Sequence, residues 1–223
     1  MNDPNNPKDT GEQRSFSRQN HGTLESYLLD RVIQTGKILD YRVSEGTTCV
    51  LGDVTPAYDP AQVLSFTRQV VFLDRQVFVV FDVVEVADAR LRRRFLLHYP
   101  AGAKIDGQGF RWTNNGGQLL VRTLLPARAS IRDIPLTERD RPTPFKNFQE
   151  WYPNGRIEVE PAVYDSPVTV FLHVMFPGDA GAPAPPVELR ESGPAYVVRI
   201  GAAELEFSRN GRALCRIARA PGL

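Results

Sequence analysis

The sequence predicts an all-β fold, a large two-layer antiparallel β-sandwich. Within residues 47–99, four long segments rich in Val, Phe, Thr and Leu follow one another almost without interruption. The connections between them are too short for the crossovers that parallel strands require, so these strands are expected to run antiparallel. A chain of 223 residues with 42% hydrophobic side chains is long enough to bury a substantial core.

The central hairpin of the predicted sheet lies at residues 61–86. The first strand, residues 61–73, alternates apolar and polar side chains, which indicates one exposed face. The second strand, residues 76–86, is apolar on both faces apart from two acidic residues, so we expect it at the centre of the sheet. We expect Arg68 to be the cross-strand ion partner of Asp82, and the four residues from Leu73 to Gln76 to form a tight turn.

The other elements are predicted from turn signals and periodicity. A short helix is expected over residues 23–34, with Thr23 as its N-cap and one apolar face. Strands are expected to begin after Gly36, and NNGG at 114–117 predicts a hairpin turn. Further strands are expected at residues 110–113, 118–126, 129–134, 156–161, 167–177, 195–200, 203–208 and 213–218.

The chain divides into four regions. Residues 1–22 are a polar loop or the remnant of an upstream region, and residues 178–186 are a linker rich in Gly, Ala and Pro. The main sandwich is expected over residues 23–177, and residues 187–223 should supply terminal strands that pack on the same sandwich. Within the main part, residues 135–155 form a long irregular segment of the kind that is often functional.

Composition excludes some functions and leaves the compartment open. With a net charge of +1, the chain has no general electrostatic attraction to nucleic acid or anionic membranes, so neither is expected as a partner. No apolar run is long enough to span a membrane, and the amino terminus lacks the apolar core of a signal peptide. One disulfide between Cys49 and Cys215 is possible, but both lie in strand-like segments where buried free thiols fit equally well.

The residues suited to catalysis or metal binding form no recognisable site. His21, His98 and His173 lack the spacing of metal ligands, so no metal site and no catalytic residue is assigned. Asp53 follows a strand and is expected to accept hydrogen bonds from the next backbone N–H groups. A less favoured alternative is an unrecognised active arrangement of His98 and Asp82.

The best candidates for a ligand surface are arginines and aromatic residues. Aromatic faces stack on sugar rings, and guanidinium groups bind carboxylate or sulfate in pairs of hydrogen bonds. The alternatives are a strand edge protected by charge and aromatic residues that cover the core. The candidate substrate-binding residues are Arg92, Arg93, Arg94, Trp112, Trp151 and Tyr152.

Eight segments, in this order and spacing, resemble the carboxy-terminal β region of the heparinase II/III-like polysaccharide lyases over residues 1–177. They are GEQR (11–14), GDVTPAY (52–58), FTRQVVFL (66–73), VVFDVVE (79–85), FLLHYP (95–100), LLVRTLLP (119–126), GRIEVEP (155–161) and FLHVMFP (171–177). The resemblance implies a bacterial protein, periplasmic or secreted, that takes part in glycosaminoglycan breakdown.

The resemblance also implies a division of labour. In that family an α/α toroid carries most catalytic groups and precedes a large β-sandwich, and uronic-acid polysaccharides are cleaved by β-elimination. The family's catalytic Tyr and His residues and its structural zinc site lie in the toroid or at the start of the β region. This chain is expected to begin after all of them, which leaves open whether it is an enzyme or a fragment of one.

Its expected role is therefore to support a toroid, in cis or in trans, and to line one wall of a cleft for acidic polysaccharide. No cofactor is expected in this chain; the zinc site that the resemblance implies would lie upstream. The alternative is a stand-alone carbohydrate-binding or structural β-sandwich without catalysis.

Overall fold

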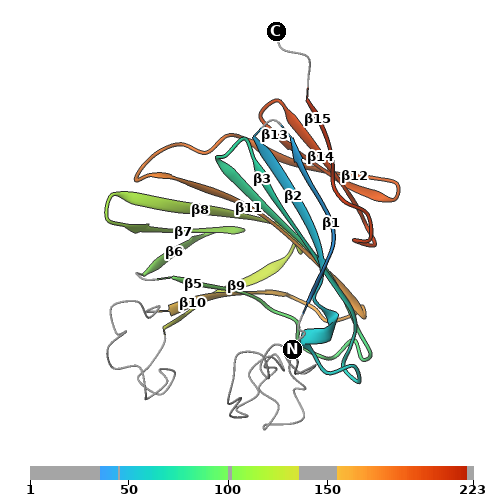
Figure 1. Ribbon diagram of the computed structural model, residues 1–223. Coiled ribbons are helices and arrows are strands. Elements are labelled where there is room, and N and C mark those ends of the chain that lie inside the picture. Colours follow the sequence, from blue (N-terminus) through green and yellow to red (C-terminus); the bar gives the residue numbers. More distant parts are fainter. Residues whose placement is uncertain (1–35, 45, 100–101, 136–154, 220–223) are drawn as a thin grey trace, which may run out of the picture.

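A computed structural model describes residues 36–44, 46–99, 102–135 and 155–219, which form three antiparallel sheets (Figure 1). The large sheet has eight strands in the order β1 (Lys37–Ser44), β2 (Thr47–Asp53), β3 (Val63–Leu73), β4 (Val77–Val86), β11 (Val168–Asp179), β8 (Gly117–Leu125), β7 (Gly109–Asn114) and β6 (Ala103–Asp106). A three-stranded sheet contains β5 (Phe95–Tyr99), β10 (Gly155–Pro161) and β9 (Ala129–Pro135). A four-stranded sheet contains β12 (Val187–Ser192), β13 (Ala195–Ile200), β14 (Ala203–Ser208) and β15 (Arg216–Arg219).

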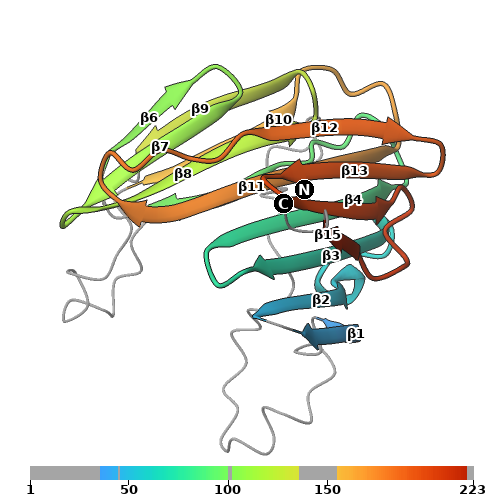
Figure 2. The same ribbon diagram turned by 90° about the horizontal axis from the view of Figure 1, so that it is seen from above.

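The two small sheets cover opposite faces of the large one (Figures 1 and 2). Successive side chains of a strand point to opposite faces. On β11, Leu172 and Val174 therefore pack with the four-stranded sheet, whereas Phe171 and Met175 pack with the three-stranded sheet. The predicted all-β antiparallel sandwich is confirmed. It has one layer more than the two expected, because strands at the centre of the large sheet are buried on both faces.

Most of the predicted strands and turns are present. The turn between β3 and β4 has Asp74 at φ +52° and Arg75 at φ +58°, and the Gln76 N–H donates to the Leu73 carbonyl oxygen at 3.0 Å. The NNGG turn uses positive φ values at Asn115 and Gly116, +50° and +80°. A short 3-10 helix, Thr55–Ala57, follows β2.

Some of the predicted elements differ from the observed ones, and others lie in residues that the structure does not describe. The short strands β6 and β12 were not predicted, because they have only four and six residues and most of their side chains are exposed. The strand expected at 213–218 is shorter, since β15 begins at Arg216. The expected linker also begins later, because β11 continues to Asp179. The helix at 23–34, the loop at 1–22 and residues 136–154 lie outside the described residues.

The loop after β14 fastens the four-stranded sheet to the large one. Gly211 has φ +67°, and a Cβ there would lie 2.8 Å from Val83 Cγ2, so only glycine fits this approach. Buried Gln69 of β3 accepts from the Cys215 N–H at 2.9 Å and donates to the Ala213 carbonyl oxygen at 3.0 Å. Cys49 and Cys215 are both buried free thiols, so the possible disulfide is not formed.

Candidate functional site

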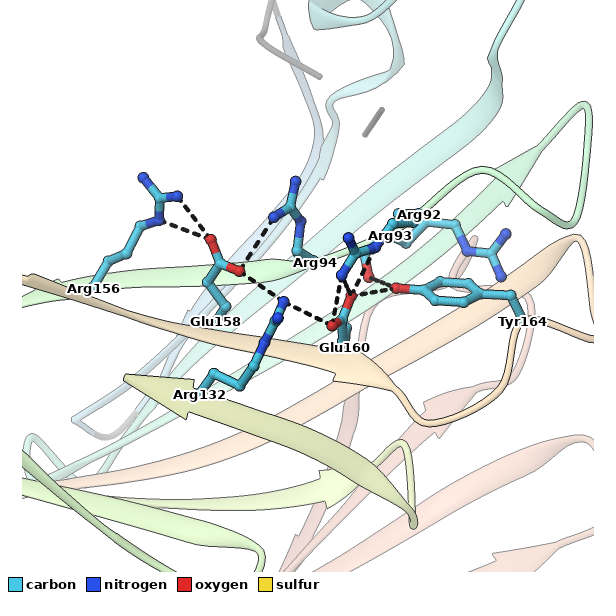
Figure 3. Close-up of polar contacts among 8 residues, drawn as sticks. All are labelled: Arg92, Arg93, Arg94, Arg132, Arg156, Glu158, Glu160 and Tyr164. Atoms are coloured by element: carbon cyan, nitrogen blue, oxygen red, sulfur yellow. Dashed lines mark hydrogen bonds and ion pairs between the residues drawn. The ribbon is translucent and has the colours of Figure 1, made fainter. Parts of the chain in front are cut away.

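The outer face of the three-stranded sheet carries a dense group of charged residues. Along β10, Ile157 and Val159 point into the core, so Arg156, Glu158 and Glu160 point the other way. The neighbouring strand β9 places Arg132 directly opposite Glu158. We call the set Arg92, Arg94, Arg132, Arg156, Glu158 and Glu160 the arginine cluster (Figure 3).

Glu158 is the first of two acidic centres in the arginine cluster. Its carboxylate accepts from Arg156 Nη2 at 2.8 Å, from Arg132 Nη2 at 3.1 Å and from Arg94 Nη1 at 3.2 Å. Burial opposes the ionisation of Glu158, but the hydrogen bond from Arg156 and the charges of Arg94 and Arg156 hold its pKa below the ordinary value. Glu158 is therefore a carboxylate at neutral pH.

Glu160 is the second acidic centre. It accepts from Arg92 Nη2 at 2.7 Å, from Arg132 Nη2 at 2.8 Å and from the Tyr164 hydroxyl at 2.7 Å. Burial raises the pKa of Glu160, but the hydrogen bonds from Arg92 and Tyr164 outweigh it and lower that pKa. Burial, together with the bond to Glu160, raises the pKa of Tyr164 to about 12. Arg132 joins the two centres, since its Nη2 contacts both carboxylates (Figure 3).

The arginine cluster has more positive than negative charge. Four guanidinium groups face two carboxylates, which leaves an excess of two positive charges. The glutamates are almost fully buried, at 2% and 6% exposure, whereas the side chains of the four arginines are 22–43% exposed. Planar, partly exposed guanidinium groups held in place by buried carboxylates are suited to bind sulfate or carboxylate groups.

Arg93 lies apart from its two neighbours in the sequence. It is 2% exposed and donates to Thr169 Oγ1 at 2.8 Å and to the carbonyl oxygens of Ala89 and Ser166, each at 2.9 Å. Its guanidinium lies 5.0 Å from the centre of the Tyr164 ring. Arg93 therefore anchors the segment before β5 to the interior, and only Arg92 and Arg94 of the predicted run reach the outer face.

The predicted aromatic residues are not gathered with the arginines. Trp112 of β7 stacks on Phe110, with ring centres 6.2 Å apart and planes 11° apart, and lies 6.2 Å from the Tyr99 ring. It is half-buried against the core beside the three-stranded sheet. Trp112 thus has the contacts expected of an aromatic residue that covers the core, and Trp151 and Tyr152 lie outside the described residues.

Arg132, Arg156, Glu158 and Glu160 were not singled out from the sequence. The alternation of charged and apolar residues over 156–160 was the available signal, because it marks one charged face of a half-buried strand. That signal does not reveal which residues oppose it. The partners come from segments more than 20 residues earlier in the chain, Arg132 in β9 and Arg92 and Arg94 before β5.

The two strand histidines have different environments. His173 is fully buried; its ring centre lies 4.0 Å from that of Phe95, and its Nδ1 lies 3.1 Å from Thr123 Oγ1. Its Nε2 has no hydrogen-bond partner among the residues that the structure describes, and burial, with the charge of Arg68, lowers its pKa to about 3. His98 is exposed on β5 opposite Arg156, and partial burial, with the charge of Arg156, lowers its pKa.

Two predicted structural roles of acidic residues are confirmed. Arg68 donates to both carboxylate oxygens of buried Asp82, at 2.8 and 2.6 Å. Burial raises the pKa of Asp82, and the bonds from Arg68 oppose that rise. Asp53 Oδ1 accepts from the Thr55 N–H at 2.9 Å. Because Arg68 occupies both oxygens of Asp82, the structure lends no support to an active pair with His98.

The described residues contain neither a candidate metal site nor a membrane-spanning helix. Within residues 36–44, 46–99, 102–135 and 155–219, no three or more His, Cys, Asp or Glu side chains are grouped so that they could hold a metal ion. The same ranges contain no helix that is long and apolar enough to cross a membrane.

Solved structures with a similar fold include heparinase III and a heparan sulfate lyase. A heparinase III gene product matches with a TM-score of 0.58 and 15% identity over 89% of this chain and 29% of its own. The heparan sulfate lyase HepC from Pedobacter heparinus matches with a TM-score of 0.54 and 14% identity over 83% of this chain and 28% of its own. No protein-family model matches the sequence, and no curated protein does.

These matches bear on the fold. The fold-level relationship to heparinase-like polysaccharide lyases, which the sequence resemblance implied, is confirmed. This chain spans less than a third of the length of either lyase.

Proposed function

We propose that the chain is the carboxy-terminal β-sandwich module of a heparinase II/III-like polysaccharide lyase. In this role it supports a catalytic α/α toroid and binds acidic polysaccharide through the arginine cluster. The observation that carries the proposal is the shared fold with heparinase III structures, over most of this chain but a small part of theirs.

The arginine cluster supports the choice of an acidic polysaccharide. The carboxylate of a uronate has two oxygens in one plane, and a sulfate group has several oxygens around its sulfur atom. Both can accept a pair of hydrogen bonds from the N–H groups of one guanidinium. Glu158 and Glu160 hold the arginines in position before the ligand arrives, which lowers the entropy lost on binding. The excess of two positive charges attracts a polyanion, and this attraction weakens as salt is added.

The proposal places the bond-breaking groups in the toroid. β-Elimination needs a base that reaches the proton at C5 of the uronate. His173 is fully enclosed and Asp82 is held by Arg68, so neither side chain can reach a substrate. The purified chain is therefore expected to bind the polysaccharide without cleaving it.

Affinity for immobilised heparan sulfate tests the binding role. We expect retention that falls with added salt, and several-fold weaker retention of the variant Arg132→Gln/Arg156→Gln. The control is Arg212→Gln/Arg216→Gln, which also removes two positive charges, but from exposed side chains outside the arginine cluster. Equal retention of both variants would contradict a role of the arginine cluster.

Product formation tests the assignment of catalysis. The unsaturated uronates produced by elimination absorb ultraviolet light, and we expect no increase in absorbance when the chain alone is mixed with heparan sulfate. Addition of a separately expressed toroid should produce the increase. Turnover by the chain alone would overturn the division of labour.

A stand-alone carbohydrate-binding or structural sandwich is the second candidate. It is favoured by the two hydrophobic cores that the described residues form among themselves. It predicts that the gene lacks an upstream open frame for a helical domain and that no toroid changes the binding. Reading the DNA upstream of Met1 discriminates between the two.

A further inference from the structure

The large sheet has a hollow on the face opposite the arginine cluster. Strands β6, β7 and β8 extend beyond the four-stranded sheet that covers β4 and β11 on this face (Figure 2). The hollow has a volume of about 730 Å³. Leu120, Leu124 and Val187 line it on one side, and all three are half-buried against the core of this face. The volume lies within the range of ordinary ligand sites, roughly 300–1,000 Å³.

Three exposed cationic side chains line the same hollow: Lys104 of β6, Arg111 of β7 and Arg122 of β8. Lys104 lies directly opposite Arg111, and Arg111 lies directly opposite Leu120, two residues from Arg122. Since alternate residues of a strand share a face, all three cations lie on one side of the sheet.

These cations have no ion-pair partner among the described residues. In the part of the chain that the structure describes, no hydrogen bond or ion pair engages the side chains of Lys104, Arg111 or Arg122. Among the described residues that line the hollow, Asp106 is the one acidic residue. Three positive charges and one negative charge thus leave an excess of two.

The pairing of Lys104 with Arg111 is unfavourable for the sheet itself. Like charges directly opposite one another destabilise a pair of antiparallel strands. By contrast, the guanidinium groups of the arginine cluster face carboxylates, and exposed Arg190 lies 3.6 Å from Glu204. An anion between Lys104 and Arg111 would convert this repulsion into two attractions.

We propose that the hollow over β6–β8 is a binding site for an anionic sugar unit. Its carboxylate or sulfate groups would contact Lys104, Arg111 and Arg122, and the apolar face of its ring would lie on Leu120, Leu124 and Val187. The anion site rests on the hollow and its unpaired cations, whereas the choice of a sugar rests on the proposed function. The site and the arginine cluster lie on opposite faces of the large sheet, so each can bind independently.

Nuclear magnetic resonance of the isotope-labelled full chain tests the proposal. The probes are a sulfated heparin disaccharide, glucuronate and inorganic sulfate, added separately. We expect the disaccharide to shift the amide signals of Lys104, Arg111 and Arg122 in a saturable way. The affinity derived from these shifts should be at least tenfold higher than that for inorganic sulfate. Absence of these shifts, or equal affinity for inorganic sulfate, would overturn the sugar site.

The variant Arg111→Gln/Arg122→Gln separates this site from the arginine cluster. We expect the affinity for the disaccharide that is measured from the amide signals of β6–β8 to fall at least tenfold in this variant. The signals of Arg132 and Arg156 should still respond to the disaccharide. If the disaccharide shifts the signals of β6–β8 in the wild type but not those of Arg132 and Arg156, the proposed function is contradicted and the hollow remains a binding site. The control Arg212→Gln removes an exposed arginine outside both sites and should leave both sets of shifts unchanged.

Stability provides a second readout. Because Arg111→Gln removes a like-charge pair, its melting temperature without ligand should equal or exceed that of the wild type, and the disaccharide should raise it less. A lower melting temperature of the free variant would show that Arg111 has a stabilising role, and would contradict the proposal.

Discussion

The ring of Tyr99 occupies the space where any other residue at position 155 would carry its side chain. Gly155 of β10 pairs directly with Tyr99 of β5, and a Cβ at Gly155 would overlap the hydroxyl and ring carbons of Tyr99. The Tyr99 hydroxyl in turn donates to Asp133 of β9. One tyrosine thus spans all three strands of the small sheet, including the strand that carries Glu158 and Glu160.

Gly155→Ala should destabilise the protein because it displaces Tyr99. Forcing an extra carbon into a filled site costs about 1–3 kcal/mol. Urea denaturation measures this loss. The control is Gly102→Ala, since a Cβ at Gly102 meets no atom within 4 Å and its backbone needs no positive φ. Equal stability of the two variants would show that Tyr99 moves without cost.

Glu158→Gln should lower stability and tighten polysaccharide binding at the same time. The substitution leaves Arg94, Arg132 and Arg156 without their shared carboxylate. Because these arginines are partly exposed, we expect a loss of about 1–2 kcal/mol, less than for a fully buried pair.

The amide oxygen of glutamine still accepts hydrogen bonds and so keeps the arginines in position. Because the variant also raises the local positive charge, it should leave heparan sulfate columns at higher salt. Glu204→Gln is the control, because it makes the same change in net charge at a surface pair with Arg190. If Glu204→Gln has an equal effect on retention, net charge and not the arginine cluster determines binding.

Stability should fall as the pH is lowered from about 7 to 5, in part because of His173. Its pKa is about 3 in the folded protein and about 6.5 when unfolded. Below pH 6.5 the unfolded chain therefore binds a proton that the folded chain does not. This difference costs about 1.4 kcal/mol per pH unit.

Replacing His173 isolates this contribution. His173→Gln should reduce the slope of unfolding free energy against pH by about one proton, whatever its effect at pH 7. His98 also has a lowered pKa, so His98→Gln serves as a comparison with a smaller reduction. An unchanged slope in His173→Gln would mean that the buried imidazole takes up a proton without unfolding. The lowered pKa values of Glu158 and Glu160 act in a more acidic window, below about pH 4.5, where their protonation removes stability.

Strand β1 should cause association at high concentration. It is an edge strand of the large sheet, and Ile38, Tyr41 and Val43 on it are 66–69% exposed. An exposed apolar edge can pair with another chain, and a lysine there opposes pairing.

We therefore expect Val43→Lys to reduce the concentration dependence of the mass measured by light scattering. Leu64→Lys, on an interior strand and at a side chain that is 54% exposed, is the control and should have little effect. A wild-type chain that stays monomeric at high concentration would show that β1 does not pair.

The central hairpin could be predicted from sequence because local signals decide it. Alternation over residues 61–73, apolar residues on both faces of 76–86 and a four-residue turn are sufficient to place Arg68 opposite Asp82. Burial on both faces showed that β4 is central. It did not show what covers each face, and this is why the third layer was not expected.

The arginine cluster required tertiary information. Arg92, Arg132 and Glu160 become neighbours only because β5 and β9 pair with opposite edges of β10. A run of three arginines gives no sign that Arg93 points inward while Arg92 and Arg94 point outward. Trp112 posed the same difficulty, since the sequence does not distinguish a sugar-stacking ring from one that closes the core.

Calorimetric titration of the chain with a heparan sulfate oligosaccharide tests the central claim most directly. We predict saturable binding at low salt that weakens as salt is added, and that is several-fold weaker in Arg132→Gln/Arg156→Gln than in the control Arg212→Gln/Arg216→Gln. No heat of binding at low salt, in a chain shown by circular dichroism to be folded, would contradict the claim that this sheet face binds acidic polysaccharide.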